Sequence, residues 1–246
     1  IFFNLLAFSF SSSNETKSTG KENLSESIQE MGTTFIKLGQ FLATRPDIIG
    51  EKLSKELESL QDKLPPFSKK EAEKIIIENL GQSNFDDIID LSEPIAAASI
   101  AQVHKAKIKE DNIIKNVAIK VLRPNIKKIF NDEIDAIMLL AYIVESLISK
   151  TKRLKLIEVV FLFKEITNHE MDLRFEAAAA NEYAENTKND LGFFVPKIYW
   201  NFTSESVLTL DWVDGVSIRE KDLLKEKNIE TSKIATNLIQ HFLRHA

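Results

Sequence analysis

Apolar residues recur with a helical spacing where patterned sequence begins. The intervals alternate between four and three residues, which predicts an amphipathic helix with one apolar face: Leu24, Ile28, Met31, Phe35, Leu38 and Leu42. Proline cannot donate a hydrogen bond within a helix, so we expect this helix to end near Pro46.

Two further helices are predicted before the pattern changes. One runs from Glu51 to about Lys63 and is stopped by Pro65-Pro66. The next begins at Ser68-Lys69-Lys70-Glu71, a capping-box sequence in which serine and glutamate satisfy each other's backbone N–H groups, and it closes at Gly81. The first third of the chain is therefore predicted to be helical.

From Ile88 onward, short apolar runs replace the helical spacing. Ile100–Val103 and Val117–Leu122 flank the turn-like Glu110-Asp111-Asn112, which predicts a pair of antiparallel strands. Helical patterning returns in two stretches, Asn125–Lys150 and Lys155–Asn186.

A second pair of strands is predicted after these helices. Val195–Phe202 and Val207–Val213 are joined by the polar turn Thr203–Ser206, which is typical of a hairpin. Helical patterning resumes around Arg219 and again from Thr231 to the end of the sequence.

Composition narrows the class of protein. With 43% hydrophobic and 28% charged residues among 246, the chain can bury a core and suits a soluble protein. The absence of cysteine excludes disulfides, thiolate metal sites and cysteine nucleophiles. The net charge of −5 argues against a nucleic-acid surface, because phosphate backbones require clustered positive charge.

The first residues require a separate interpretation. Ile1–Phe10 is apolar but shorter than the roughly 20 residues of a membrane span, so we interpret it as the tail of a truncated helix. A signal peptide is the alternative, although no basic segment precedes the apolar run. Ser11–Asn23 is rich in Ser, Thr, Lys and Glu and is predicted to be a linker.

Three features have the arrangement of a nucleotide site. The loop Ala96-Ala97-Ala98-Ser99 would cover phosphates, Lys120 of Val117-Ala118-Ile119-Lys120 would contact them, and Glu176 would orient that lysine. The alternative is an ordinary lysine at a strand end and a packing turn of small residues. Phosphate loops normally use glycine, because backbone N–H groups must approach the anion, and alanine restricts that geometry.

Five motifs follow one another along the chain between Leu24 and Ala246. They are Phe35-Ile36-Lys37-Leu38-Gly39-Gln40, Ala96-Ala97-Ala98-Ser99-Ile100-Ala101-Gln102-Val103-His104, Val117-Ala118-Ile119-Lys120, Glu170-Met171-Asp172 with Glu176-Ala177, and Leu210-Asp211-Trp212-Val213-Asp214-Gly215. In this order they resemble the N-terminal portion of the UbiB-type atypical kinase-like family of ubiquinone biosynthesis. Ordered agreement of several motifs is more specific than any one of them.

The resemblance implies an adenine-nucleotide site. In that family an alanine-rich loop replaces the kinase glycine-rich loop, which accounts for Ala96, Ala97, Ala98 and Ser99. Lys120 is then expected to contact the nucleotide phosphates, with Glu176 holding it as an ion pair in the role of the helix-C glutamate. The segment from Asp211 to Val213 is expected to be the hinge that offers backbone hydrogen bonds to adenine.

Lys37 and Gln40 belong to the family's signature helix. From spacing alone, at about 100° per residue, they lie opposite the apolar face, where solvation is the simpler interpretation. The resemblance instead implies that they lie over the nucleotide cleft, with Lys37 paired with Glu170 and occupying space that a protein substrate would need. Gly39 is expected to permit close helix packing.

Asp172 and Glu176 are four residues apart in a predicted continuous helix. Their carboxylates would stack on one face and repel each other unless cations stand nearby, and Lys37 and Lys120 are the cations we expect. The alternative is a pair of ordinary exposed acids matched by Arg174 and Lys188.

The histidines are interpreted as structural. His241 and His245 have the i, i+4 spacing of a metal pair, but no third ligand is apparent, so we predict no metal site among these residues. His104, in a predicted strand, and His169 are expected to be hydrogen-bonded residues rather than bases.

Together these features predict an α+β fold. The expected architecture is a protein-kinase-like N-lobe, with a small antiparallel sheet and helix C, after a helical N-terminal extension and before the beginning of a helical C-lobe. The predicted divisions are the apolar edge and linker (1–23), the extension with the Lys-x-Gly-Gln motif (24–87), the N-lobe with inserted helices (88–213) and the incomplete C-lobe (214–246).

By resemblance, the protein is an atypical kinase or ATPase that binds ATP or ADP with Mg²⁺ and supports ubiquinone biosynthesis. The metal ligands are expected beyond residue 246. Because no His-x-Asp or Asp-Phe-Gly element occurs in this sequence, we expect the chain alone to be inactive. The alternative is a non-catalytic regulatory module of kinase-like shape that binds a lipid or a protein.

The resemblance also implies partners and a location. The expected partners are an adenine nucleotide and either prenylated quinone precursors or other proteins of ubiquinone biosynthesis, but no nucleic acid. The full-length protein is expected in the cytoplasm of a bacterium or an organelle, peripheral to or anchored in the inner membrane.

Overall fold

The computed structural model describes residues 27–28, 30–58, 60, 64–190 and 192–245. The described residues form helices and one small antiparallel sheet, which confirms the predicted α+β class. Contacts divide the chain into two compact units. We call them the helical unit (residues up to Phe67, Ala96–Gln102 and Leu122–Met171) and the sheet unit (Ser68–Ile95, Val103–Val121 and Asp172 onward).

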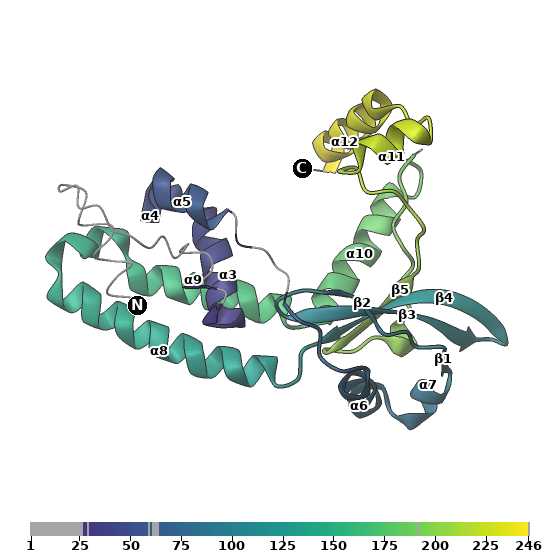
Figure 1. Ribbon diagram of the computed structural model, residues 1–246, viewed down its shortest axis with the longest axis horizontal. Coiled ribbons are helices and arrows are strands. Elements are labelled where there is room, and N and C mark those ends of the chain that lie inside the picture. Colours follow the sequence, from purple (N-terminus) through teal and green to yellow (C-terminus); the bar gives the residue numbers. More distant parts are fainter. Residues whose placement is uncertain (1–26, 29, 59, 61–63, 191, 246) are drawn as a thin grey trace. The chain divides into compact units, whose positions relative to one another are not determined.

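Helices pack around an apolar core in the helical unit. They are α3 (Thr33–Ala43), α4 (Pro46–Ile49), α5 (Glu51–Leu57), α8 (Ile126–Leu147) and α9 (Leu156–Glu170), with the 3₁₀ turn η1 (Ser149–Leu154) between the last two. The long helices α8 and α9 lie side by side (Figure 1). The ring of Phe163 lies 5.6 Å from those of Phe41 and Phe130, so one α9 side chain joins α3 to α8.

An apolar cavity of about 150 Å³ lies within the helical unit. Side chains of α3, α5, α8 and α9 line it, among them Leu38, Leu53, Ala141 and Val160. Gly39 also lines it, and a Cβ atom at this position would clash with Leu60 Cδ1. The expected close packing at Gly39 is therefore present, and its neighbours are Leu60 and Ile28.

The first predicted helix is not continuous. Gly32 adopts φ 103°, a conformation that suits glycine, and α3 begins only after it at Thr33. The part of the prediction from Leu24 to residue 26 lies outside the described residues. The second predicted helix is shorter than expected, because α5 ends at Leu57.

The sheet has five strands: β1 (Ile88–Ile89), β2 (Pro94–Ala97), β3 (Ala101–Glu110), β4 (Ile113–Leu122) and β5 (Val207–Asp211). Their order is β1-β3-β4-β5, and β2 also pairs with β3. Asp111 and Asn112 connect β3 to β4 with φ of 51° and 61°, which is the geometry of a tight hairpin turn. The predicted hairpin is therefore confirmed, and Figure 1 shows its two long strands.

Helices accompany the sheet in its own unit. They are α6 (Lys69–Leu80), α7 (Gln82–Asp86), α10 (Leu173–Thr187), α11 (Lys221–Glu226) and α12 (Thr231–His245), and both α6 and α10 contact β5. The predicted capping box is present, since Ser68 Oγ accepts from the Glu71 N–H and Glu71 Oε2 accepts from the Ser68 N–H. The predicted end at Gly81 is also confirmed.

The helix predicted over Lys155–Asn186 was wrong in one respect, because it is two helices. Asp172 leaves the helical conformation, with φ −119° and ψ 97°, and separates α9 from α10. The Leu173 N–H donates to the Glu205 carbonyl at 2.9 Å, which ties the start of α10 to a loop far along the chain. A long-range hydrogen bond of this kind leaves no periodic signal in the sequence.

The strand predicted over Val195–Phe202 is also wrong. Only an isolated bridge between Ile198 and Leu210 forms there, and Trp200–Phe202 is a 3₁₀ turn. Pro196 has no N–H to give to a strand ladder, which limits regular pairing in this segment. Of its predicted partner, Val207–Asp211 is confirmed as a strand.

Among the described residues, no helix combines the length with the apolar character needed to cross a membrane.

Candidate functional site

Strand β4 presents Lys120 on its less buried face. Val117, Ile119 and Val121 alternate with it and are fully buried, so Ala118 and Lys120 share the opposite face. On β5, Leu210 pairs with Ala118 and Leu208 pairs with Lys120, and directly opposed residues lie on the same face. The nearest neighbours of Lys120 on this face are therefore the apolar side chains of Ala118, Leu208 and Leu210. The alternation of Val117–Lys120 could have identified Ala118 as part of this face.

Helix α10 brings a carboxylate to this lysine. Glu176 lies in the first turn of α10, and its Oε2 is 2.7 Å from Lys120 Nζ. The lysine side chain is 27% exposed and the glutamate 50% exposed, so both are accessible to solvent, and the lysine is accessible to an anionic ligand. This is the contact that the sequence predicted, and it fixes the lysine in a charge-assisted hydrogen bond.

A second ion pair joins α3 to the end of α9 within the helical unit. Lys37 Nζ lies 2.7 Å from Glu170 Oε2, which is the pairing implied by the resemblance. Lys37 is only 16% exposed, so the simpler interpretation of a solvated lysine is wrong. Gln40 is partly buried on the same helix, and its side chain makes no hydrogen bond with the described residues.

Asp172 does not share a helical face with Glu176. It is the N-cap of α10, where its Oδ1 accepts from the Arg174 N–H at 3.1 Å. Its carboxylate also binds the Arg174 guanidinium at 2.6 and 2.9 Å, which raises the pKa of Arg174. The expected stack of Asp172 on Glu176 is therefore wrong, and Arg174 provides a cation beside Asp172.

The alanine segment turns sharply between β2 and β3 in the helical unit. Ala96 and Ala97 are the last residues of β2 rather than loop residues, Ser99 is buried, and the Ala98 N–H donates to the Ala101 carbonyl at 2.8 Å. These contacts hold the turn closed without glycine.

Arg123 fastens this turn from the chain that follows β4. Its guanidinium donates to the Ala98 carbonyl at 2.8 and 3.1 Å and to the Pro65 carbonyl at 3.0 Å. Buried Gln102 binds both backbone groups of Phe67 from the adjoining strand. Sequence reasoning missed Arg123 and quoted Gln102 only as part of a motif, without a role, because side chains that bind distant backbone groups have no local signature.

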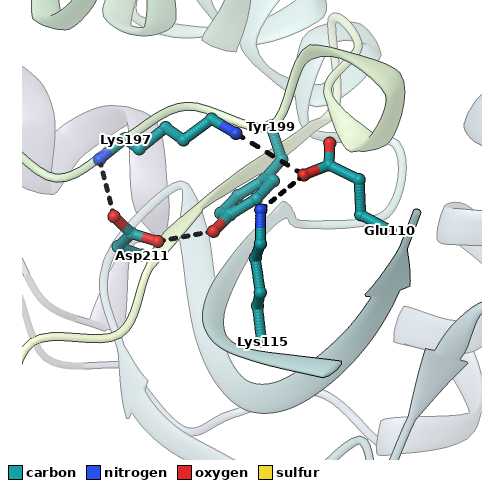
Figure 2. Close-up of polar contacts among 5 residues, drawn as sticks. All are labelled: Glu110, Lys115, Lys197, Tyr199 and Asp211. Atoms are coloured by element: carbon teal, nitrogen blue, oxygen red, sulfur yellow. Dashed lines mark hydrogen bonds and ion pairs between the residues drawn. The ribbon is translucent and has the colours of Figure 1, made fainter. Parts of the chain in front are cut away.

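The Asp211 side chain binds the segment from Lys197 to Tyr199, whereas the role expected for Asp211 was a main-chain hydrogen bond to adenine. Its Oδ1 accepts from Tyr199 Oη at 2.6 Å, and its Oδ2 accepts from the Lys197 N–H at 3.2 Å (Figure 2). Val213, two residues further, is 49% exposed, and its N–H has no acceptor among the described residues. Sequence reasoning missed Tyr199, since nothing in its neighbourhood marks it.

Tyr199 is enclosed by charged side chains. It is 2% exposed, and the ammonium groups of Lys115 and Lys197 lie 5.2 and 4.7 Å from its ring centre. Glu110 Oε2 lies 2.7 Å from Lys115 Nζ and 3.5 Å from Lys197 Nζ (Figure 2). Lys115 lowers the pKa of Glu110, while burial and the Asp211 carboxylate raise the pKa of Tyr199, so its phenol remains a donor.

The histidines have structural surroundings. His104 is fully buried in β3, where its Nδ1 lies 2.8 Å from the Ser92 carbonyl. His241 Nδ1 lies 3.2 Å from Asp190 Oδ2, whereas the side chain of His245 is outside what the structure describes. Within the described residues, no group of three or more His, Asp or Glu has an arrangement that could hold a metal ion.

Comparison with known proteins identifies relatives of this chain. The ABC1 atypical kinase-like domain matches residues 59–246. Three bacterial proteins called probable protein kinase UbiB are 32% identical over 222 residues (Marinobacter nauticus), 33% over 222 residues (Cellvibrio japonicus) and 34% over 225 residues (Tolumonas auensis).

These alignments cover most of this chain and less than half of each relative. The covered share of this chain is 90% for the first two and 89% for the third. The chain spans about 40% of the length of the curated relatives it matches.

Proposed function

Since this chain belongs to the ABC1 atypical kinase-like domain family, together with the UbiB proteins, we propose that it binds an adenine nucleotide at Lys120. The observation that carries the proposal is the 2.7 Å contact between Lys120 Nζ and Glu176 Oε2. A kinase-like lobe uses such a pair to hold a lysine against nucleotide phosphates. The α+β fold with a small antiparallel sheet agrees with this lobe.

The surroundings of Lys120 fit a nucleotide phosphate. Its ammonium group is partly exposed and already oriented by Glu176, so a phosphate oxygen can bind without a rearrangement of the strand. Carboxylates repel phosphate, and the lysine offsets this by neutralising Glu176. When bound, Mg²⁺ neutralises charge on the phosphates, and we assign none of its ligands to residues of this chain.

The same face of the sheet suits a planar base. Ala118 and Leu210 are adjacent across β4 and β5, and small or apolar side chains leave room for an aromatic ring. The main chain from Asp211 to Val213 leaves β5 beside them, with the Val213 N–H available for a hydrogen bond. We propose that this segment binds the edge of adenine. The roles predicted for Ala96–Ser99, Lys37 and Gln40 remain proposals that are based on the family resemblance alone.

The reaction is proposed for the whole protein. The relatives are called probable protein kinases, and kinase-like folds use ATP with Mg²⁺ for phosphoryl transfer or hydrolysis. We propose that the protein uses one of these reactions in support of ubiquinone biosynthesis, at a membrane that contains prenylated quinone precursors. Lys120 and Glu176 would orient the phosphates for either reaction.

Isothermal titration of the 246-residue chain with Mg²⁺-ATP tests the proposal. Lys120→Ala should weaken ATP binding by roughly tenfold to a hundredfold, because one hydrogen bond to a charged group is lost. Lys107→Ala is a matched control, since Lys107 is also a sheet lysine in a 2.7 Å ion pair, with Asp90, and should leave binding unchanged.

Two results would count against nucleotide binding. One is the absence of any ATP binding by the folded chain, which would favour a non-catalytic interaction module. The other is equal ATP affinity in the parent and in Lys120→Ala, which would place any nucleotide elsewhere.

A further inference from the structure

The segment from Lys197 to Tyr199 fastens the outer edge of β5. The Tyr199 N–H donates to the Thr209 carbonyl at 2.9 Å, and the Asp211 N–H donates to the Lys197 carbonyl at 3.0 Å. On the inner edge, the Trp212 N–H donates to the Asn116 carbonyl at 3.1 Å. The main chain is therefore held on both sides at the point where it leaves the sheet.

The Asp211 side chain strengthens this attachment. Both of its oxygens bind the outer segment, one through the Tyr199 hydroxyl at 2.6 Å and the other through the Lys197 N–H at 3.2 Å (Figure 2). A hydroxyl bound to a carboxylate at this distance is among the stronger hydrogen bonds in proteins. Because both carboxylate oxygens face the outer segment, we assign any contact of Asp211 with a base to its main chain.

Tyr199 is itself held rigidly. Its side chain is buried, and the ammonium groups of Lys115 and Lys197 lie over its ring. Glu110 binds both lysines and so keeps them in place (Figure 2). The phenol therefore has one orientation, directed at Asp211. A tyrosine enclosed in this way restricts the orientation of the residue to which it donates a hydrogen bond.

We propose that Tyr199 is a positioning residue for adenine recognition. Its hydrogen bond to Asp211 fixes the direction in which the main chain of Asp211–Val213 meets the base. Without that bond, the end of β5 keeps its backbone pairing but loses its side-chain anchor. The inference rests on the proposed function, because it assigns base recognition to this segment.

The test separates base recognition from phosphate binding. Tyr199→Phe removes one hydroxyl and keeps the buried ring, and affinities for Mg²⁺-ATP and for inorganic tripolyphosphate are measured by titration of the whole 246-residue chain. ATP affinity should fall by roughly threefold to thirtyfold. This range assumes that a hydrogen bond to a charged group is lost and that only part of its free energy affects ATP binding. Tripolyphosphate affinity should not change, because this ligand has no base.

A control and a second variant make the result specific. Tyr142→Phe alters an exposed tyrosine of α8 in the same way and should change neither affinity. Asp211→Asn alters the other partner of the bond and should also lower only ATP affinity. The double variant Tyr199→Phe with Asp211→Asn should lose little more than the larger single effect, since both substitutions act on one contact. If Tyr199→Phe does not fold, Asp211→Asn carries the same comparison.

The outcomes are distinguishable. Equal losses for ATP and tripolyphosphate in Tyr199→Phe, or an unchanged ATP affinity, overturn the positioning role while nucleotide binding at Lys120 stands. Failure of the parent chain to bind either ligand overturns the proposed function and removes the basis of this inference.

Discussion

At the scale of single residues, His104 shows how burial determines chemistry. Its ring is fully buried in β3, and its Nδ1 must carry the hydrogen that is donated to the Ser92 carbonyl, because a carbonyl only accepts. Burial lowers the pKa of His104 below its ordinary value of 6.5, against smaller opposite effects of the Ser92 carbonyl and Glu93. The imidazole is therefore neutral in the folded protein.

This environment predicts a pH dependence of stability. Between 6.5 and the lower folded pKa, the unfolded chain binds a proton that the folded chain does not, so the free energy of unfolding falls as pH decreases. The contribution approaches about 1.4 kcal/mol per pH unit in that window. His104→Asn, which keeps a hydrogen-bond donor without the titration, should show a shallower decline in urea denaturation at pH 7.5, 6.5 and 5.5. Parallel declines in the two proteins would contradict the prediction.

Residue contacts were predictable where the family motifs implied them. The pairs of Lys120 with Glu176 and of Lys37 with Glu170 are present at 2.7 Å. The partner of Asp172 could not be chosen in the same way, because a helix cap forms only if the helix begins there. The bond from Tyr199 to Asp211 depends on a loop path that no spacing encodes.

At the scale of elements, the start of helix α6 was predicted correctly from adjacent residues. Ser68 and Glu71 satisfy each other's N–H groups, and the hydrogen bonds from Ser68 lower the pKa of Glu71. The Glu71 side chain gives the Ser68 N–H an acceptor, and the Ser68 hydroxyl adds a second acceptor for the Glu71 N–H beside the Ser68 carbonyl. Four adjacent residues determine the start of this helix, and no tertiary contact is required.

Ser68→Ala should therefore lower the free energy of unfolding by about 1 kcal/mol, since the side-chain acceptor for the Glu71 N–H is lost. Chemical denaturation followed by circular dichroism measures the change. Lys70→Ala, at an exposed position in the same turn, provides the control and should have little effect. A Ser68→Ala protein as stable as the control would show that the cap contributes nothing.

Elements that depend on distant partners were predicted less well. The break between α9 and α10 follows from the Leu173 N–H bonding to Glu205, and the irregular course of 195–202 follows from Pro196 and the 3₁₀ turn. The hairpin of β3 and β4 was predictable, because its turn residues and its alternation lie next to each other in the sequence. The hairpin depends on contacts between residues that are close in sequence, whereas the helix break depends on a residue far along the chain.

At the scale of the whole molecule, each compact unit is assembled from three separate stretches of sequence. The helical unit includes Ala96–Gln102 and Leu122–Met171, and the sheet unit takes the stretches between and after them. Periodicity identifies elements but not which of them pack together, so this interleaving was not predictable. The α+β class was predictable, because it requires only the count and type of elements.

Nucleotide binding predicts a change in the stability of the molecule. At free ATP about 100 times its dissociation constant, binding to the folded chain adds roughly 2.7 kcal/mol. For a chain of this size, that corresponds to a rise in Tm of roughly 5–10 °C in differential scanning fluorimetry. Lys120→Ala should lose most of the rise, and Lys107→Ala should keep it. Equal rises in both variants would indicate that ATP binds away from Lys120.

The interruption at Asp172 has a mechanical consequence. Glu170 and Glu176 are six positions apart, yet the first ends α9 and the second belongs to α10. The acids that meet Lys37 and Lys120 thus belong to two separate ladders of helical hydrogen bonds, so fraying at the end of α9 does not unravel the turn of α10 that carries Glu176.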